Sequence, residues 1–122
     1  MNDKAKKILI VDDEQQFRAF LSDFFLTLGY KVVEESNALS VIRTIKKENP
    51  DLITLDLKMA GANGIQIVKT MKREGIDTPI IVISGYLGSE EIKKLVDLGV
   101  KHIISKPAKI DTIQKKVESI LA

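Results

Sequence analysis

The feature that most constrains the fold is the alternation of short apolar runs with amphipathic helical patterns along the 122 residues. Runs this apolar are typical of strands that are covered on both faces, as in a parallel sheet. Neighbouring parallel strands need a crossover between them, and here each crossover carries a helical pattern. We therefore expect β-strands at residues 7–11, 31–35, 51–56, 79–84 and 102–105.

Between these runs, apolar residues recur at spacings of three and four, which predicts helices with one buried face. We expect these side chains to face the core, and they form five groups. The groups are Phe17, Phe20, Leu21, Phe24, Phe25 and Leu28; Leu39, Ile42 and Ile45; Ile65, Val68 and Met71; Ile92, Leu95 and Val96; and Ile113, Val117, Ile120 and Leu121.

Glycines mark the ends of three of these patterns. Gly29, Gly75 and Gly99 each follow one, where a left-handed residue commonly ends a helix. Right-handed crossovers then give an α/β, (βα)₅ doubly wound, flavodoxin-like fold, with a five-stranded parallel sheet of order 2-1-3-4-5. The length fits one compact domain over residues 1–122, and we expect no output domain.

Composition narrows the classes of function. The formal net charge of +2 and the scattered lysines give no basis for direct nucleic-acid binding. The chain has no cysteine, which excludes disulfides, thiol catalysis and cysteine metal sites. It shows neither a secretory signal nor an apolar run of membrane-spanning length, so we expect a cytoplasmic protein without membrane contact.

Polar residues stand where the expected strands end. Asp12 and Asp13 follow the first strand, Asp56 and Ser84 end the third and fourth, and Lys106 follows the fifth. Ligands of such sheets bind outside the carboxyl ends of the strands, so these side chains should converge. Three acids in one pocket resist ionising together unless a hard divalent cation is present, and Mg²⁺ prefers carboxylate oxygens. The paired aspartates therefore predict a Mg²⁺ site.

A carboxylate at such a site can act as a nucleophile towards phosphorus and form an aspartyl phosphate. Phosphoryl transfer depends mainly on positioning and charge neutralisation. Mg²⁺ would neutralise one phosphoryl oxygen on Asp56, Lys106 a second, and the hydroxyl of Ser84 would donate to a third. This assigns Asp56, Lys106 and Ser84 as the catalytic groups.

Four short motifs carry a resemblance to a known family. They are "LIVDDE" at 9–14, "DLITLDLKMAGANG" at 51–64, "IIVISG" at 80–85 and "IISKPA" at 103–108. In this order and spacing, over nearly the whole chain, they resemble the receiver domain of two-component response regulators. The resemblance implies that Asp56 is phosphorylated by a histidine kinase or a histidine phosphotransfer protein. It also implies a metal site formed by Asp12, Asp13, Asp56 and the backbone carbonyl of Lys58.

Several further properties follow from the resemblance alone. Ser84 and Lys106 would sense the phosphoryl group, and the Lys106–Pro107 bond would be cis. The protein would then signal to a downstream protein target or pass the phosphate on, as a monomer or a phosphorylation-linked dimer. It would be a signalling protein and not an enzyme. The phosphodonor would dock on the first helix and the loop after Lys106, and output would use the fourth helix, fifth strand and fifth helix.

Three positions modify this expectation. Ile103 stands at the switch position where the family usually has an aromatic residue, which puts aromatic switching in doubt. Lys58 and Tyr86 should flank the phosphoryl group, and their long side chains would obstruct the hydrolytic water. The combination is similar to the single-domain receivers of the sporulation phosphorelay, and it suggests a slowly hydrolysing phosphoaspartate.

Other readings stay open. Asp13 with Gln16 approximates a capping box, so Asp13 could cap the first helix, alone or in addition to binding metal. A phosphate-independent adaptor would share the fold. An aspartate-based phosphohydrolase would use the same nucleophile, although Lys58 stands where such enzymes carry a second acid. A flavodoxin-like cofactor binder is disfavoured because the loops contain no GxGxxG phosphate cradle.

Overall fold

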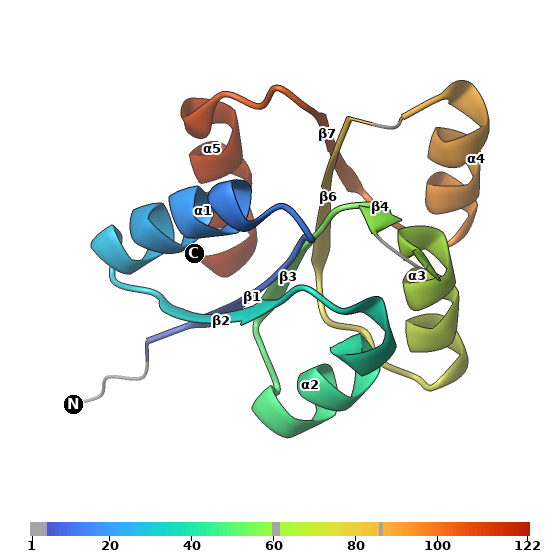
Figure 1. The fold of residues 1–122 in the computed structure, drawn as a ribbon, viewed down its shortest axis with the longest axis horizontal. Coiled ribbons are helices and arrows are strands. Elements are labelled where there is room, and N and C mark those ends of the chain that lie inside the picture. The colour runs from blue at the N-terminus through green and yellow to red at the C-terminus, as the bar shows by residue number, and fades with distance from the viewer. Residues whose placement is uncertain (1–4, 60–61, 86) are drawn as a thin grey trace.

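The computed structural model describes residues 5–59, 62–85 and 87–122, in which a twisted parallel sheet has helices on both faces (Figure 1). Within these residues the sheet has five strands in the order β2-β1-β3-β6-β7. These strands correspond in chain order to the five expected, so the predicted order 2-1-3-4-5 is confirmed. Their bounds are Lys7–Val11 (β1), Lys31–Glu35 (β2), Leu52–Leu55 (β3), Ile80–Ser84 (β6) and His102–Ser105 (β7).

The helices form two layers, one on each face of the sheet (Figure 1). Helices α1 and α5 cover one face, around a core that contains Phe25 and Ile113. Helices α2, α3 and α4 cover the other face, around a core that contains Val68 and Leu95. Their bounds are Gln15–Thr27 (α1), Val41–Glu48 (α2), Gly64–Arg73 (α3), Ser89–Asp97 (α4) and Ile110–Leu121 (α5). All four residues of β3 are buried, as expected of a central strand covered on both faces.

The helix ends agree with the glycine pattern. Gly29, Gly75 and Gly99 all have positive φ, which confirms the predicted helix ends. Helix α2 ends instead on Asn49, which adopts the left-handed conformation with φ of 49°. Asparagine tolerates this conformation better than most residues, because its short polar side chain can bond locally.

Five apolar side chains that we expected in the core are exposed: Phe20, Leu28, Leu39, Ile92 and Val96. Leu39 is 88% exposed because it lies in a short 3₁₀ helix, η1 (Ala38–Ser40), that precedes α2 and does not share its inner face. The buried stripe of α1 contains Leu21, Ser22 and Phe25, so Phe20 lies outside it. In α4 only Leu95 is buried, because one narrow row of this helix meets the sheet.

A small two-stranded sheet beside the main one was not expected from the sequence. Two-residue strands β4 (Lys58–Met59) and β5 (Ala62–Asn63) pair antiparallel directly after β3. This small hairpin leads into α3, whose N-cap residue Asn63 accepts a hydrogen bond from the N–H of Ile65 at 2.9 Å. It therefore fixes the path of the chain just beyond Asp56.

The turn into α3 depends on Gly64. A Cβ placed on this residue would lie 2.7 Å from the Cα of Leu57 and 2.8 Å from the backbone oxygen of Asp56. Both neighbours are backbone atoms, so the contact cannot be relieved by rotating a side chain. The glycine thus allows the hairpin to pack closely against the segment that carries Asp56.

We expect Gly64→Ala to lower the free energy of unfolding by about 1–3 kcal/mol, the usual range for overpacking. Urea denaturation would measure the change. Gly88→Ala is the matched control, since the added Cβ there meets only the flexible carboxylate of Glu91. Equal stability of Gly64→Ala and Gly88→Ala would contradict the close packing.

Candidate functional site

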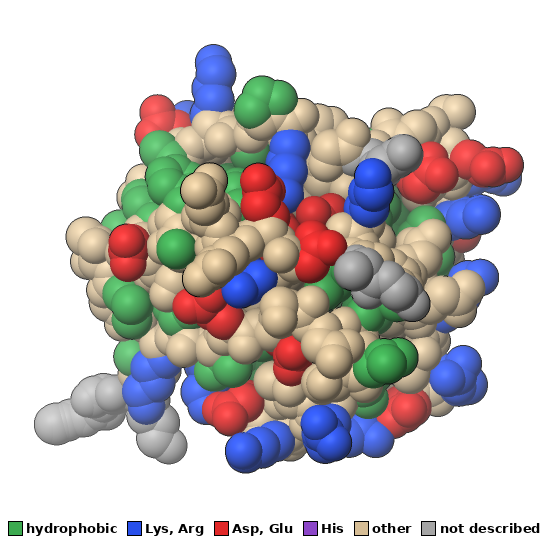
Figure 2. Space-filling model, in the orientation of Figure 1, with side chains coloured by type: hydrophobic (Ala, Val, Ile, Leu, Met, Phe, Trp, Pro, Cys, Tyr) green, Lys and Arg blue, Asp and Glu red, His purple; other side chains and the backbone are tan. Residues whose placement is uncertain are grey.

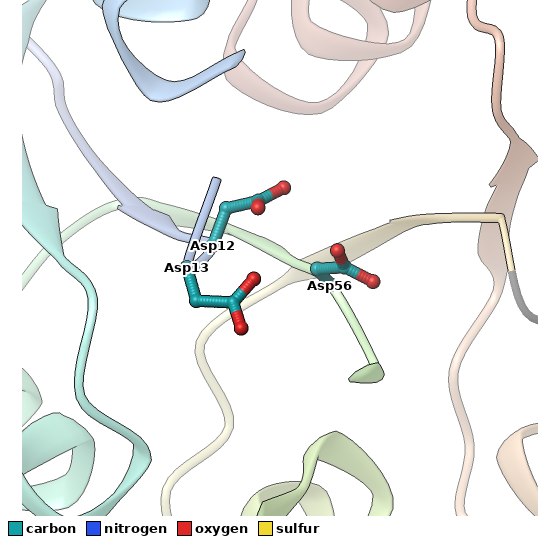
Figure 3. A group of neighbouring side chains, drawn as sticks. All are labelled: Asp12, Asp13 and Asp56. Atoms are coloured by element: carbon teal, nitrogen blue, oxygen red, sulfur yellow. The ribbon is translucent and has the colours of Figure 1, made fainter. Parts of the chain in front are cut away.

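The sheet places the three acidic side chains at one edge. Strands β1 and β3 are parallel neighbours, with Val11 opposite Leu55 at their carboxyl ends. The pairing continues one step further, because the N–H of Asp56 donates to the carbonyl of Val11 at 3.0 Å. Figure 3 shows the side chains of Asp12, Asp13 and Asp56 projecting from these two strand ends into the same space.

These carboxylates form a compact group. Carboxylate oxygens of Asp12, Asp13 and Asp56 all lie within 4.8 Å of one another. Asp12 and Asp56 are buried, at 2% and 8% exposure, whereas Asp13 is exposed. A set of oxygen ligands with one side open to solvent suits Mg²⁺, which binds one or two carboxylates and keeps several waters. The donor atoms present therefore fit the ion that the sequence predicted.

Lys106 brings a positive charge to the same group. Its Nζ lies 3.0 Å from Oδ2 of Asp12, 3.2 Å from Oδ2 of Asp56 and 3.4 Å from Oε1 of Glu14. The Lys106–Pro107 peptide bond is cis, as the resemblance implied. The N–H of Lys106 also donates to the carbonyl of Ser84 at 2.9 Å, which joins this loop to the end of β6.

Burial and neighbouring charges together shift the pKa values of Asp12 and Lys106. Burial raises the pKa of the Asp12 carboxyl above its ordinary value, although the N–H of Glu14 and the ammonium of Lys106 pull it back. Burial alone would lower the pKa of Lys106, but its hydrogen bonds and charge interactions with Asp12 and Asp56 outweigh this and leave the pKa raised. Lys106 therefore stays protonated, and a cation bound near Asp12 would further favour the ionised form of this buried carboxyl.

Backbone N–H groups orient the acids. The N–H of Glu14 donates to Oδ1 of Asp12 at 2.9 Å, and the N–H of Lys58 donates to Oδ1 of Asp56 at 3.2 Å. Each carboxylate is thus held by a residue two positions further along the chain. This leaves Oδ2 of both Asp12 and Asp56 facing Lys106.

The N-cap residue of helix α1 is Glu14 and not Asp13. Helix α1 begins at Gln15, and its N-cap residue is Glu14, whose side chain makes no cap hydrogen bond within the described part of the chain. Asp13 therefore stands one residue too early to be the N-cap. Its carboxylate lies in the acidic cluster, where Figure 3 shows it beside Asp56.

The remaining predicted residues lie around this centre. Ser84 is fully buried at the carboxyl end of β6, opposite Ser105 of β7. Ile103 is half-buried, pairs with Val82 and packs against the core under α3 and α4. Lys58 is exposed on β4. The side chain of Tyr86, expected to flank the phosphoryl group, lies outside the described residues.

Sequence reasoning missed the contacts of three residues on α1 and at its N-terminus. Besides the contact of Glu14 with Lys106, the ring of Phe17 lies under Nζ of Lys106, 4.2 Å from the ring centroid. Arg18 donates to the backbone oxygen of Asp12 at 2.7 Å and to Glu34 at 3.2 Å, which ties the end of β1 to β2. The only signal for these roles was the position of the residues directly after the acidic pair.

The surface around the site is mixed in charge. Figure 2 shows acidic side chains gathered near the middle of the face, with Lys or Arg side chains beside them. Among the described residues, none of the helices is both long and apolar enough to cross a membrane.

Comparison with known proteins agrees with the geometry. A family model described as response regulator receiver domain matches residues 8–118. Sporulation initiation phosphotransferase F of Bacillus subtilis (strain 168) is 35% identical over 116 residues, which cover 95% of this chain and 94% of that protein. Chemotaxis protein CheY of the same organism is 30% identical over 118 residues, covering 96% of this chain and 98% of that protein.

A solved structure supports the fold alone. The receiver domain protein (CheY-like) from Methanospirillum hungatei superposes with a TM-score of 0.90 at 22% sequence identity. The match covers 95% of this chain and 93% of that one.

We expect Asp13→Asn to weaken Mg²⁺ binding by about tenfold or more, because the variant removes one charge and one hard oxygen ligand. Isothermal titration calorimetry of the purified protein would measure the dissociation constant. Asp23→Asn is the matched control, an exposed acid of α1 outside the cluster. Equal Mg²⁺ affinity of both variants would exclude Asp13 from the metal site.

Proposed function

The chain belongs to the response regulator receiver family, and on that basis we propose that it accepts a phosphoryl group on Asp56 in a Mg²⁺-dependent reaction. Receiver domains belong to two-component signalling, and they are signalling proteins and not classical enzymes. The observation that carries the proposal is the convergence of Asp12, Asp13 and Asp56 with Lys106 placed between two of them.

In the proposed reaction an oxygen of the Asp56 carboxylate attacks the phosphorus of a phosphohistidine. The P–N bond of the donor breaks as the new P–O bond forms, and the histidine ring leaves with the electron pair and takes up a proton. Bound Mg²⁺ would supply charge neutralisation at a phosphoryl oxygen. Lys106, already 3.2 Å from Oδ2 of Asp56, is placed to donate to a second oxygen. Ser84 would donate to the third.

The same residues account for a switch. Ser84 and Lys106 are joined by a backbone hydrogen bond of 2.9 Å, so movement of either towards the phosphoryl group affects both β6 and the loop after β7. Ile103 packs in the core beside Val82. We expect it to transmit this movement by repacking of an aliphatic side chain, since it has no ring or hydroxyl to bury.

We further propose that residues 1–122 act as one cytoplasmic receiver domain, with a histidine kinase or a histidine phosphotransfer protein as donor. The 35% identity to a protein named sporulation initiation phosphotransferase F favours a relay, in which the phosphoryl group passes on to another protein. A downstream protein target would otherwise read the phosphorylated state.

The test of phosphorylation is direct. On incubation with acetyl phosphate and Mg²⁺, we expect the intact protein to gain the mass of one phosphoryl group, and Asp56→Asn to gain none. Asp77→Asn, an exposed acid that precedes β6 at the opposite edge of the sheet from Asp56, is the matched control and should behave as wild type.

Other outcomes identify other functions. Failure of the wild-type protein to gain mass would favour a phosphate-independent adaptor. Continuous release of phosphate over many turnovers would instead indicate a phosphohydrolase. A gain of mass that does not need Mg²⁺ would contradict the proposed role of the acidic cluster.

We expect a long-lived phosphoaspartate and a several-fold shorter lifetime in Lys58→Ala, because the lysine stem would no longer hinder the hydrolytic water. The decay of the phosphorylated mass after removal of donor measures this. Lys69→Ala, on the exposed side of α3, is the control. Rapid decay in the wild type, unchanged by Lys58→Ala, would rule out the protective role.

A further inference from the structure

The ammonium of Lys106 is enclosed by more partners than its proposed chemistry requires. Two of them, Asp12 at 3.0 Å and Asp56 at 3.2 Å, belong to the acidic cluster. The other two lie outside the cluster: Glu14 at 3.4 Å and the face of the Phe17 ring at 4.2 Å from its centroid. This second pair belongs to the start of α1 and has no part in the reaction described above.

The shared carboxylates create a competition. Oδ2 of Asp12 and Oδ2 of Asp56 face Lys106 in this structure, and the same two side chains belong to the oxygen cluster that fits Mg²⁺. A divalent cation on these oxygens neutralises them, so their attraction for the ammonium falls. Lys106 then needs other partners if it is to stay at the mouth of the site.

We propose that Phe17 and Glu14 are positioning residues that form a seat for the ammonium of Lys106, and that this seat allows Mg²⁺ and Lys106 to occupy the site together. The proposal deepens the proposed function and rests on it, because it concerns the lysine assigned to the phosphoryl group. Phe17 and Glu14 touch neither Asp56 nor the phosphoryl group in this account; they act through Lys106.

The environment favours a real contribution from Phe17. The side chain of Lys106 is only 19% exposed, and cation–π attraction is stronger where water is excluded. Phe17 is itself half-buried and packs against the core under α1 and α5, and its ring lies 6.3 Å from that of Phe20. The ring is thus fixed by packing, so it can contact a cation with little further loss of side-chain conformational entropy.

Glu14 contributes differently. Its side chain is 60% exposed, so water weakens its attraction for Lys106. It supplies a solvent-exposed negative charge 3.4 Å from the ammonium, in addition to the two buried aspartates. Phe17 therefore provides the fixed surface of the seat, and Glu14 balances the charge when Mg²⁺ takes the inner carboxylates.

The seat should matter more with Mg²⁺ bound than without it. In the metal-free site the ammonium has three carboxylates as partners, and the ring is one contact among several. With Mg²⁺ bound, the ring and Glu14 are the partners that remain. The ring contact exists in both states, so only its strengthening on metal binding changes the affinity. Loss of the ring should therefore weaken Mg²⁺ binding by about two- to fivefold at most, the range expected for one partly desolvated cation–π contact.

The experiment is a double-mutant cycle on Mg²⁺ affinity, measured by calorimetry on the full chain. Phe17→Leu keeps the apolar bulk but removes the π face, and it changes no charge. We expect the two- to fivefold loss in Phe17→Leu, recovery in Phe17→Tyr, and no loss when Phe17→Leu is made in a Lys106→Met background. Phe24→Leu is the matched control, a half-buried aromatic of the same helix whose ring packs against Phe25.

Two results would overturn the proposal. One is wild-type Mg²⁺ affinity in Phe17→Leu; the other is an equal loss with and without Lys106, which would show a merely structural role. If Phe17→Leu does not fold, Glu14→Gln completes the same cycle, because its exposed side chain can be changed without disturbing the core. Absence of Mg²⁺ binding in the wild type would also refute the seat.

The seat and the phosphoacceptor function fail in different ways. Coupling between Phe17 and Lys106 in Mg²⁺ binding, without phosphorylation by acetyl phosphate, would keep the seat and refute the function. Phosphorylation of Asp56 without any such coupling would keep the function and refute the seat. Mg²⁺ affinity tests the seat and mass gain tests phosphorylation, so the two proposals are tested independently.

Discussion

The close approach of like charges at the carboxyl edge of the sheet is the constraint on which the site depends. Three carboxylates have oxygens within 4.8 Å of one another, and two of these acids are buried. Such a group is unfavourable unless cations and N–H donors compensate it. The structure provides the donors from Glu14 and Lys58 and one cation from Lys106. The crossover turns at the ends of β1, β3 and β7 bring these compensating groups together.

The sequence was sufficient for the fold and for the centre of the site, because both follow from periodicity and topology. Buried parallel strands read as apolar runs, and their order decides which strand ends are neighbours. Asp12, Asp13, Asp56 and Lys106 each stand at the end of an expected strand or just beyond it, so their meeting could be predicted without any side-chain geometry. The roles assigned to them remain predictions.

Other features could not be predicted, because they depend on rotation about a helix axis or on loop geometry. Phe20 and Phe17 both fitted the apolar pattern of α1, yet Phe20 is half exposed and Phe17 contacts a cation. Periodicity places a residue on a broad face and does not say which edge of that face meets a neighbour. The hairpin of β4 and β5 was likewise missed, since two-residue strands have no pattern to detect.

Lys106 combines a position that the topology predicts with contacts that only the packing of α1 explains. Its place in the chain is explained by topology, but its ammonium is held by a helix that follows a different strand, 89 positions away in the case of Phe17. A lysine bound only to the acidic cluster would be a competitor of Mg²⁺. A lysine that also has partners outside the cluster can withdraw from the inner carboxylates and remain within reach of Asp56. The packing of α1 against the sheet is therefore part of the chemistry of the site, since it decides where this one positive charge can go.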